Sequence, residues 1–281
     1  MAEKIELAAP VVKWAGGKRQ LLEEILPLLP REMPVYCEPF LGGGAVLLAV
    51  QPQRALVNDL NADLITVYRV IRDNPDGLIA ALRAHQNTAD YFYAIRSLDR
   101  DREAYEALSP VEKASRLIYL NKTCYNGLFR VNASGAFNVP FGRCKNPNIV
   151  NEPVLRAVSE YFQSAQVELY SEDFAQTLQR LPSGGFAYLD PPYDPVSGTA
   201  SFTGYSKGGF GREEQRRLKA CCDALTGRGV RFMLSNSATD FIKDLYRDYH
   251  IVTVRAKRAI NAKASLRGEI EEVLITNYES P

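Results

Sequence analysis

The sequence lacks any apolar run long enough to cross a membrane, and it has few residues that bind metals. Its 281 residues include two histidines and five cysteines, and no two cysteines form a C-x-x-C pair. The first segment, MAEKIELAAPVVKW, has no apolar stretch of signal-peptide length. These absences argue against a membrane protein, a secreted disulfide framework and a metal centre. We therefore expect a cytoplasmic protein with reduced thiols and no bound metal.

Excess charge of either sign is also missing. The net charge is only +1, so the total gives no reason to expect a nucleic-acid partner. However, residues 116–148 and 255–267 each hold five basic residues and no acidic one. Two such stretches form an electropositive face if they meet, and ordinary solvated surface if they do not. The basic residues are Arg116, Lys122, Arg130, Arg143 and Lys145, then Arg255, Lys257, Arg258, Lys263 and Arg267.

Short apolar runs alternate with helix-like segments through much of the chain. Runs such as Phe186–Leu189 are typical of strands buried on both faces of a mainly parallel sheet. Residues 212–228 carry an apolar helical stripe and are followed by a glycine that stops a helix. This rhythm predicts a doubly wound α/β domain. The expected strands are Val35–Glu38, Ala55–Asn58, Val167–Tyr170, Phe186–Asp190, Arg231–Ser235, His250–Val254 and Val273–Asn277.

The alternation stops between Asp63 and about Gln166. The interval is helix-rich at first, and then rich in asparagine, glycine and aromatic residues from Asn121 to Asn148. A hundred residues is too long for a connection without structure in a compact domain. We predict that residues 1–62 and 166–281 form one domain, and that residues 63–165 form a folded, helix-rich insertion.

A glycine-rich turn follows the first expected strand. Glu38-Pro39-Phe40-Leu41-Gly42-Gly43-Gly44 leads into an apolar helix at residues 45–50, and glycines allow a ligand to approach the backbone closely. The second strand ends at Asp59, which can accept hydrogen bonds from both hydroxyls of a ribose. Because the loop is not G-x-G-x-x-G, it favours an adenosine cofactor without pyrophosphate over NAD or FAD.

Asp190-Pro191-Pro192-Tyr193 ends another apolar strand, where open α/β sheets bind ligands. Two prolines fix the backbone and remove two N–H donors, which leaves carbonyl groups for a substrate. The lone pair of an aromatic amine is delocalised until the nitrogen becomes tetrahedral. The Asp190 carboxylate and the Pro191 carbonyl can accept the two amine protons, and the Tyr193 ring can stack on the base. These residue types therefore suit methylation of a planar amine, whether adenine N6 or cytosine N4.

Together these motifs resemble the Dam-type, D12-class DNA adenine methyltransferases of the α group. The resemblance covers nearly the whole chain. It implies a Rossmann-like methyltransferase with a mainly parallel seven-stranded sheet and an inserted target-recognition domain. The matching motifs are K-W-A-G-G-K at 13–18, E-P-F-L-G-G-G at 38–44, N-D-L-N at 58–61, Y-N-G-L-F-R-V-N at 125–132, F-N-V-P-F-G-R at 137–143, D-P-P-Y at 190–193 and L-S-N-S at 234–237.

The resemblance implies S-adenosylmethionine as the cofactor, with S-adenosylhomocysteine as the product. Trp14 and Lys18 resemble cofactor contacts, and Asp59 would hold the ribose. Asp173 and Phe174 resemble the contacts to the cofactor adenine, while Asp190 would be shared between cofactor and target amine. The full set of expected cofactor residues is Trp14, Lys18, Glu38, Phe40, Gly42, Asp59, Asp173, Phe174 and Asp190.

The resemblance also implies double-stranded DNA as substrate, with the target adenine flipped out of the duplex. Arg130 would read a guanine edge through a bidentate contact, and Lys13 resembles the lysine that reaches the first guanine of G-A-T-C. Leu128 and Pro140 resemble apolar contacts to bases. Tyr125 and Asn126 would fill the space that the extruded adenine leaves, and Arg143 resembles a phosphate contact.

Several expectations extend beyond this site. Residues 200–205 would form a loop over the target pocket, with Ser197 and Tyr205 as supports. The family suggests a cytoplasmic, bacterial or phage-encoded monomer, with a cognate restriction endonuclease as a possible partner. Three other classes remain open: a methyltransferase acting on RNA or protein glutamine, a nucleic-acid binder with an inactive cofactor fold, and a nucleotide-dependent oxidoreductase. The long basic insertion argues against a methyltransferase of RNA or protein glutamine. The intact acid argues against an inactive binder, and the glycine pattern argues against an oxidoreductase.

Overall fold

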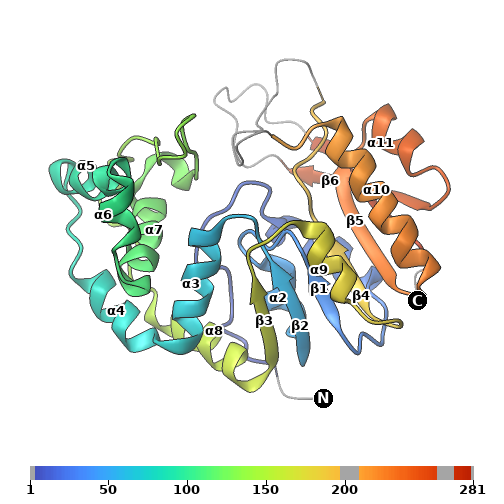
Figure 1. Ribbon diagram of the computed structural model, residues 1–281, viewed down its shortest axis with the longest axis horizontal. Coiled ribbons are helices and arrows are strands. Elements are labelled where there is room, and N and C mark those ends of the chain that lie inside the picture. Colours follow the sequence, from blue (N-terminus) through green and yellow to red (C-terminus); the bar gives the residue numbers. More distant parts are fainter. Residues whose placement is uncertain (1–3, 197–208, 258–268, 280–281) are drawn as a thin grey trace.

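One twisted sheet organises the computed structural model, which describes residues 4–196, 209–257 and 269–279 (Figure 1). Over these residues the sheet has seven strands in the order β3-β2-β1-β4-β5-β7-β6. The first five strands are parallel, whereas β7 runs antiparallel to both β5 and β6. This confirms the expected mainly parallel α/β architecture. The strands are β1 (Tyr36–Glu38), β2 (Arg54–Asn58), β3 (Gln166–Tyr170), β4 (Phe186–Leu189), β5 (Arg231–Ser237), β6 (His250–Lys257) and β7 (Glu269–Thr276).

Helices connect these strands. No helix of the described residues has the length and apolar character needed to span a bilayer. The α-helices are α1 (Leu22–Ile25), α2 (Ala45–Val50), α3 (Ala62–Asp73), α4 (Pro75–Arg83), α5 (Ala89–Ser97), α6 (Arg102–Glu106), α7 (Pro110–Thr123), α8 (Glu152–Ser164), α9 (Phe174–Arg180), α10 (Arg212–Gly227) and α11 (Asp240–Leu245). The 3₁₀ turns are η1 (Lys18–Leu21), η2 (Leu26–Leu28), η3 (Leu98–Arg100) and η4 (Tyr125–Gly127).

The sheet is buried on both faces because its side chains alternate between two apolar cores. In β4, Phe186 and Tyr188 belong to one core, and Ala187 and Leu189 belong to the other. The first core includes residues of α1, α2, α3 and α8, and the second includes residues of α9, α10 and α11. This two-sided burial explains why the strands are continuous apolar runs in the sequence.

The order of the strands creates the crevice in which a site is expected. β1 lies between β2 and β4, so the connections on its two sides lead in opposite directions. Ligands bind outside the carboxyl ends of the strands at such a switch point. The glycine loop follows β1 and Asp190 follows β4, so both sequence motifs reach this crevice.

The segment between β2 and β3 is helix-rich, as expected, and it extends to the left of the sheet in Figure 1. Its outer part has a small apolar cluster of its own, which contains Phe92, Tyr119 and Phe137. Its first and last helices, α3 and α8, instead share the first core with the sheet. The division of the chain at residues 62 and 166 stays a prediction.

Candidate active site

The glycine loop is shaped by two close contacts. Gly42 has a φ of +49°, and a Cβ added there would lie 2.9 Å from Cδ1 of the Trp14 ring. Its N–H donates to Asp59 Oδ2 at 2.9 Å, while Asn61 N–H donates to Asp59 Oδ1 at 2.9 Å. Trp14 therefore lies directly against the loop, and Asp59 is oriented at the end of β2. A carboxylate offers about four acceptor sites, so two remain for ribose hydroxyls.

Glu38 lies beneath this loop. Its carboxyl is buried, and Tyr36 Oη donates to Glu38 Oε2 at 2.6 Å. Burial, together with the negative charge of Asp190, raises the pKa of Glu38 to about 8. The hydrogen bond from Tyr36 acts in the opposite direction and lowers this pKa. Only 2% of Glu38 is exposed, so its geometry suits support of the loop more than direct contact with a ligand.

Asp190 is the centre of a buried polar cluster. Lys18 Nζ lies 2.7 Å from Asp190 Oδ1, and Ser235 Oγ donates to the same oxygen at 3.0 Å. Burial raises the pKa of Asp190, whereas Lys18 and Ser235 oppose that rise. Within the described residues no group donates to Asp190 Oδ2. Within the described residues the carboxylate is therefore held through Oδ1 alone.

The Tyr193 ring is held on one face and at its hydroxyl. Lys18 Nζ lies 4.7 Å from the ring centroid, a cation–π arrangement. Tyr193 Oη donates to Glu272 Oε2 of β7 at 2.7 Å. Lys18, expected as a cofactor contact, thus also joins the acid and the aromatic ring of the D-P-P-Y motif.

The turn itself is held by residues to which the sequence analysis gave no role. Gln215 of α10 is fully buried, and its Nε2 donates to the Pro192 carbonyl at 2.8 Å. Asn236 of β5 accepts from Asp194 N–H at 3.0 Å and donates to Gln215 Oε1 at 3.1 Å. Among the described residues nothing donates to the Pro191 carbonyl. The L-S-N-S motif, which resembled the family but had no role assigned, therefore supports the catalytic turn.

Aromatic rings line the other side of the crevice. Phe40 lies 5.3 Å from Phe174 and 5.8 Å from Phe210 between ring centroids. Phe210 was not among the expected residues, because a lone phenylalanine just before α10 has no distinguishing signal. Asp173 caps α9 by accepting from Ala175 N–H at 2.9 Å, and it also pairs with Arg217. Arg217 in turn covers the Phe174 ring at 4.5 Å.

All of the expected DNA contacts except Lys13 lie on one segment of the insertion. Tyr125, Asn126, Arg130, Pro140 and Arg143 are exposed, and Leu128 is half-buried. Tyr125 N–H donates to the Pro140 carbonyl at 2.9 Å, and Cys124 pairs with Phe141 and Val131 with Phe137 as antiparallel bridges. Residues 124–141 thus fold back on themselves, and we name them the readout hairpin.

One of the expected basic surface residues is not at the surface. Arg116 is 5% exposed, pairs with Asp99 at 2.8 Å and donates to two backbone carbonyls at the end of α5. The interpretation of residues 116–148 as a continuous basic face was wrong at this position, because a tertiary carboxylate partner draws the arginine inward. Arg258, Lys263 and Arg267 of the second stretch, and the expected loop with Ser197 and Tyr205, lie outside the described residues.

A smaller basic cluster is present instead. Lys122 of α7 is largely buried, and burial together with the charges of Lys13 and Arg19 lowers its pKa. Within the part of the chain that the structure describes, none of the three pairs with a carboxylate. These three cations form a local positive patch. The patch lies beside the readout hairpin, because Asn121 forms hydrogen bonds with both Lys13 and Gly127.

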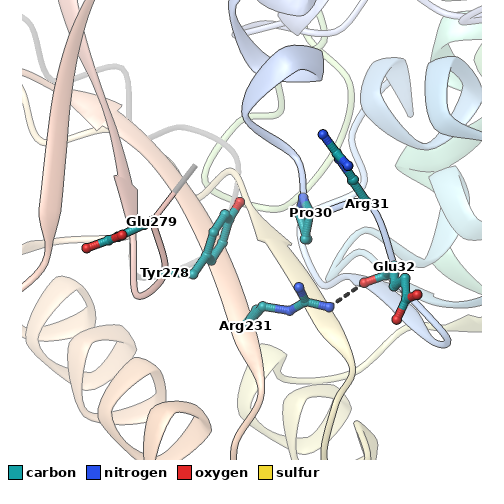
Figure 2. A pocket seen from close by; sticks show the side chains of 6 residues that line it. All are labelled: Pro30, Arg31, Glu32, Arg231, Tyr278 and Glu279. Carbon is teal, nitrogen blue, oxygen red and sulfur yellow. Dashed lines mark hydrogen bonds between the residues drawn. The ribbon is translucent and has the colours of Figure 1, made fainter. Parts of the chain in front are cut away.

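A separate hollow lies at the start of β5, at the other end of the sheet from Asp190. Figure 2 shows its six lining residues, among which Arg231 donates to the Glu32 carbonyl. Arg31 and Arg231 are balanced there by Glu32 and Glu279. It has none of the motif residues and takes no part in the site.

The fold and the site define a Rossmann-like α/β enzyme with a glycine loop, an acid at the end of β2 and a D-P-P-Y turn at the end of β4. The chain belongs to the D12 class N6 adenine-specific DNA methyltransferase family, whose model matches residues 14–260. It is 44% identical to the Type II methyltransferase M1.LlaDCHI of Lactococcus lactis subsp. cremoris, over 96% of this chain and 95% of the relative.

Two further relatives cover the chain equally well. Type II methyltransferase M.MjaIII of Methanocaldococcus jannaschii is 39% identical over 96% of this chain and 99% of its own length. The DNA adenine methylase of Escherichia coli K12 is 34% identical over 94% of this chain and 93% of its own length. The relatives thus include both Type II methyltransferases and a protein named only as a DNA adenine methylase.

Proposed function

We propose that this DNA adenine methyltransferase transfers the methyl group of S-adenosylmethionine to N6 of an adenine extruded from duplex DNA, with GATC as the expected target. The observation that carries the proposal is the partly buried Asp190 carboxylate, held through Oδ1 at the carboxyl end of β4. It lies in the same crevice as the glycine loop and Asp59.

The residues around the crevice fit a nucleoside cofactor. Asp59 retains acceptor sites for a ribose, and the Phe40 and Phe174 rings offer an apolar wall for a purine. At Gly42 the Trp14 ring fills the space that a Cβ would need, so packing inside the protein requires a glycine at this turn of the loop. When bound, S-adenosylmethionine would supply an electrophilic methyl group. The finer assignments of Glu38, Asp173 and Lys18 to this cofactor remain part of the proposal.

The protein's own contribution is to hold the amine and to take its proton. Asp190 Oδ2 and the Pro191 carbonyl can accept hydrogen bonds from the two N6–H groups. These bonds favour a tetrahedral nitrogen with an available lone pair. N6 gains the methyl group and gives up one proton, which Asp190 accepts and later releases to water. Tyr193 is fixed by Lys18 and Glu272, so its ring can stack on the base without reorganising.

DNA would be read by the readout hairpin. Arg130 and Lys13 would contact guanine edges, and Arg143 a phosphate. Tyr125 and Asn126 would occupy the gap in the duplex, and Leu128 and Pro140 would touch neighbouring bases. A monomer suits modification of one strand at a time, and a cognate restriction endonuclease would be encoded beside a Type II enzyme of this kind.

The test is transfer of a labelled methyl group from S-adenosylmethionine to unmethylated duplex DNA, followed by nucleoside analysis and sequencing of the methylated sites. We expect label in N6-methyladenine within one short motif, and none with the Asp190→Ala variant, whose DNA affinity should stay within a few fold. Label in cytosine, in RNA or in protein, or full turnover by Asp190→Ala, would contradict the proposal.

A further inference from the structure

Arg130 does not extend freely from the readout hairpin. Its Nε donates to Oδ1 of Asn138 at 2.8 Å, and its Nη2 reaches the Asn138 carbonyl at 3.5 Å. The backbone pairs as well, because Asn138 N–H donates to the Arg130 carbonyl at 3.0 Å. One asparagine thus contacts the arginine through its side chain and its backbone.

These contacts leave a particular edge of the guanidinium open. The group has five N–H donors in a planar fork. Asn138 takes the Nε donor and one Nη2 donor. The remaining Nη1 and Nη2 donors form the end of the fork, which has the geometry for a bidentate contact to O6 and N7 of guanine. Asn138 therefore selects which edge of Arg130 faces the DNA.

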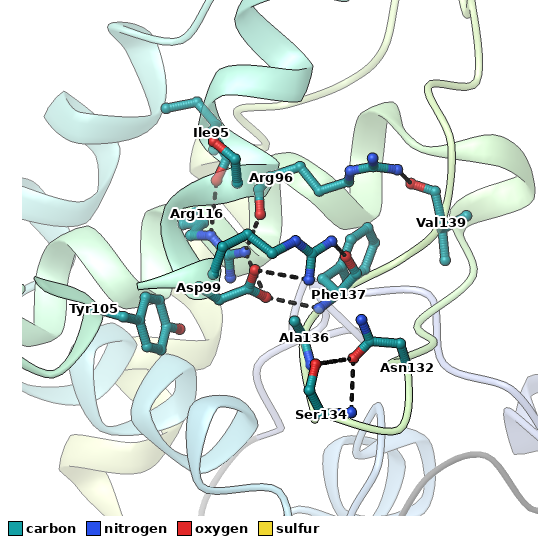
Figure 3. A network of polar contacts seen from close by, with 12 residues as sticks. Ile95, Arg96, Asp99, Tyr105, Arg116, Asn132, Ser134, Ala136, Phe137 and Val139 are labelled. Carbon is teal, nitrogen blue, oxygen red and sulfur yellow. Dashed lines mark hydrogen bonds and ion pairs between the residues drawn. The ribbon is translucent and has the colours of Figure 1, made fainter. Parts of the chain in front are cut away.

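The segment that carries Asn138 is fixed at Phe137 and Val139 by side chains of α5 and η3 (Figure 3). Asp99 Oδ2 accepts from Phe137 N–H at 2.7 Å, and Arg100 donates to the Phe137 carbonyl at 2.6 Å. Arg96 donates to the Val139 carbonyl at 3.2 Å. The residues before and after Asn138 are thus both tied to the helices.

Asp99 is itself held by Arg116 from α7. The pair is 2.8 Å apart, with only 6% of the Arg116 side chain and 10% of the Asp99 side chain exposed. Arg116 also donates from Nε to the Ile95 carbonyl and from Nη2 to the Arg96 carbonyl at the end of α5. Asp99 Oδ1 has no hydrogen-bond partner among the described residues and only the charge of Arg100 Nη1 at 3.4 Å, so the pair depends on the contacts of Oδ2. Loss of Arg116 would leave the buried Asp99 carboxylate without its main counter-charge.

We propose that Asn138 is a positioning residue for base reading, that it fixes the Arg130 fork, and that the Asp99–Arg116 pair holds Asn138 in place from the helical side. The inference rests on the proposed role of Arg130 in reading a guanine. It predicts that specificity at one base pair depends on residues that need not touch the DNA.

The experiment measures kcat/KM on unmethylated duplexes that contain the target motif. It repeats the measurement on duplexes that each change one base pair of that motif. Arg130→Ala identifies the base pair that Arg130 reads, through a loss of about tenfold or more in discrimination. We expect Asn138→Ala to lose about three- to tenfold in discrimination at that same base pair and little at the others. Combining the two substitutions should cause no further loss there.

Two variants separate positioning from a general defect. Asn138→Asp keeps the acceptor for Arg130 Nε and should restore discrimination, even if added negative charge lowers overall DNA affinity. Asp99→Asn should lower discrimination at the same base pair, whereas Asp90→Asn, an exposed acid in the first turn of α5, should not. Asn148→Ala, an exposed asparagine of the insertion, should leave the ratio unchanged.

An equal loss of activity on every duplex with Asn138→Ala would overturn the proposal, because it would indicate a phosphate contact or a folding defect. Retained discrimination in Asn138→Ala beside a clear loss in Arg130→Ala would overturn it as well. If Arg130→Ala changes discrimination nowhere, the proposed reading role of Arg130 is refuted instead, and this outcome is distinct from the other two.

Discussion

At the residue scale, the chemistry depends on how Lys18 and Ser235 balance the burial of Asp190. Burial raises the pKa of Asp190 and so favours the protonated form, which cannot accept the amine proton. Both neighbours bind Oδ1 and favour the charged form. A raised pKa makes the ionised Asp190 a stronger proton acceptor than an ordinary aspartate.

Lys18→Gln should therefore move the acid limb of the plot of kcat against pH to higher pH. Lys18 lowers the pKa of Asp190, so its removal raises that pKa, and the ionised form is lost earlier as the pH falls. The measurement is kcat against pH at saturating cofactor and DNA. Lys219→Gln, which removes a lysine paired with Asp223 on α10, serves as the control and should leave the limb in place. An unchanged limb in Lys18→Gln would contradict this account.

Glu38 predicts a pH dependence of stability. Its pKa is about 8 in the folded protein against an ordinary value of 4.5, so the folded state binds the proton more tightly than the unfolded state. The free energy of unfolding should fall as the pH rises from about 4.5 to about 8 and then level off. Urea unfolding of the ligand-free protein across this window should show a smaller slope for Glu38→Gln. Glu24→Gln, an exposed acid of α1, should keep the slope of the parent. Equal slopes in all three would show that Glu38 is not protonated on folding.

At the element scale, the sequence predicted the strands well and the supports of the site poorly. All seven strands occur with bounds within four residues of those expected, because most of them contain a short apolar run between turns. β5 continues to Ser237 through polar residues that no periodicity marks as strand. Their burial depends on antiparallel pairing with β7, for example of Asn236 with Val273. This pairing joins segments that are distant in the sequence, so local patterns do not show it. Arg116 was misjudged for the same reason, since its partner Asp99 is distant in sequence.

Gly142→Ala tests the readout hairpin as an element. A Cβ at this position would lie 2.4 Å from the carbonyl oxygen of Cys124, and backbone atoms cannot move aside cheaply. We expect a stability loss of about 1–3 kcal/mol and a marked loss of DNA affinity, with cofactor affinity little changed. Calorimetry and separate DNA and cofactor titrations measure these. Gly227→Ala at the end of α10, where a Cβ meets nothing within 4 Å, is the matched control. Normal DNA binding by Gly142→Ala would show that the hairpin tolerates the shift.

At the scale of the whole molecule, the N-terminal segment ties the sheet to the insertion. Asn121 of α7 accepts from Lys13 N–H at 2.8 Å and donates to the Lys13 carbonyl at 2.8 Å. Trp14 stacks on Phe129 with ring centroids 4.8 Å apart. The K-W-A-G-G-K motif thus contacts the glycine loop, the catalytic acid and the hairpin. The sequence showed that this motif resembles the family but not that it joins the two parts.

Within the patch formed by Lys13, Arg19 and Lys122, Lys122 should contribute electrostatic affinity without sequence preference. Neutralising one phosphate contact lowers the slope of log K against log salt concentration by about 0.9. Lys122→Gln should therefore weaken binding to all duplexes alike and reduce that slope by about this amount. Lys113→Gln on the same helix, where Lys113 lies beside Glu106, provides the control. A slope that Lys122→Gln leaves unchanged would place this patch away from the DNA.

Trp14 has a thermodynamic consequence, because its ring touches the loop at Gly42 on one side and the residue before Arg130 on the other. A donor molecule that fixes the indole also fixes Phe129, and DNA that fixes the hairpin also fixes the indole. Coupling between two binding sites is reciprocal. By whatever factor the methyl donor tightens DNA binding, DNA must therefore tighten the hold on the donor by the same factor, and a Trp14 variant would lose both factors together.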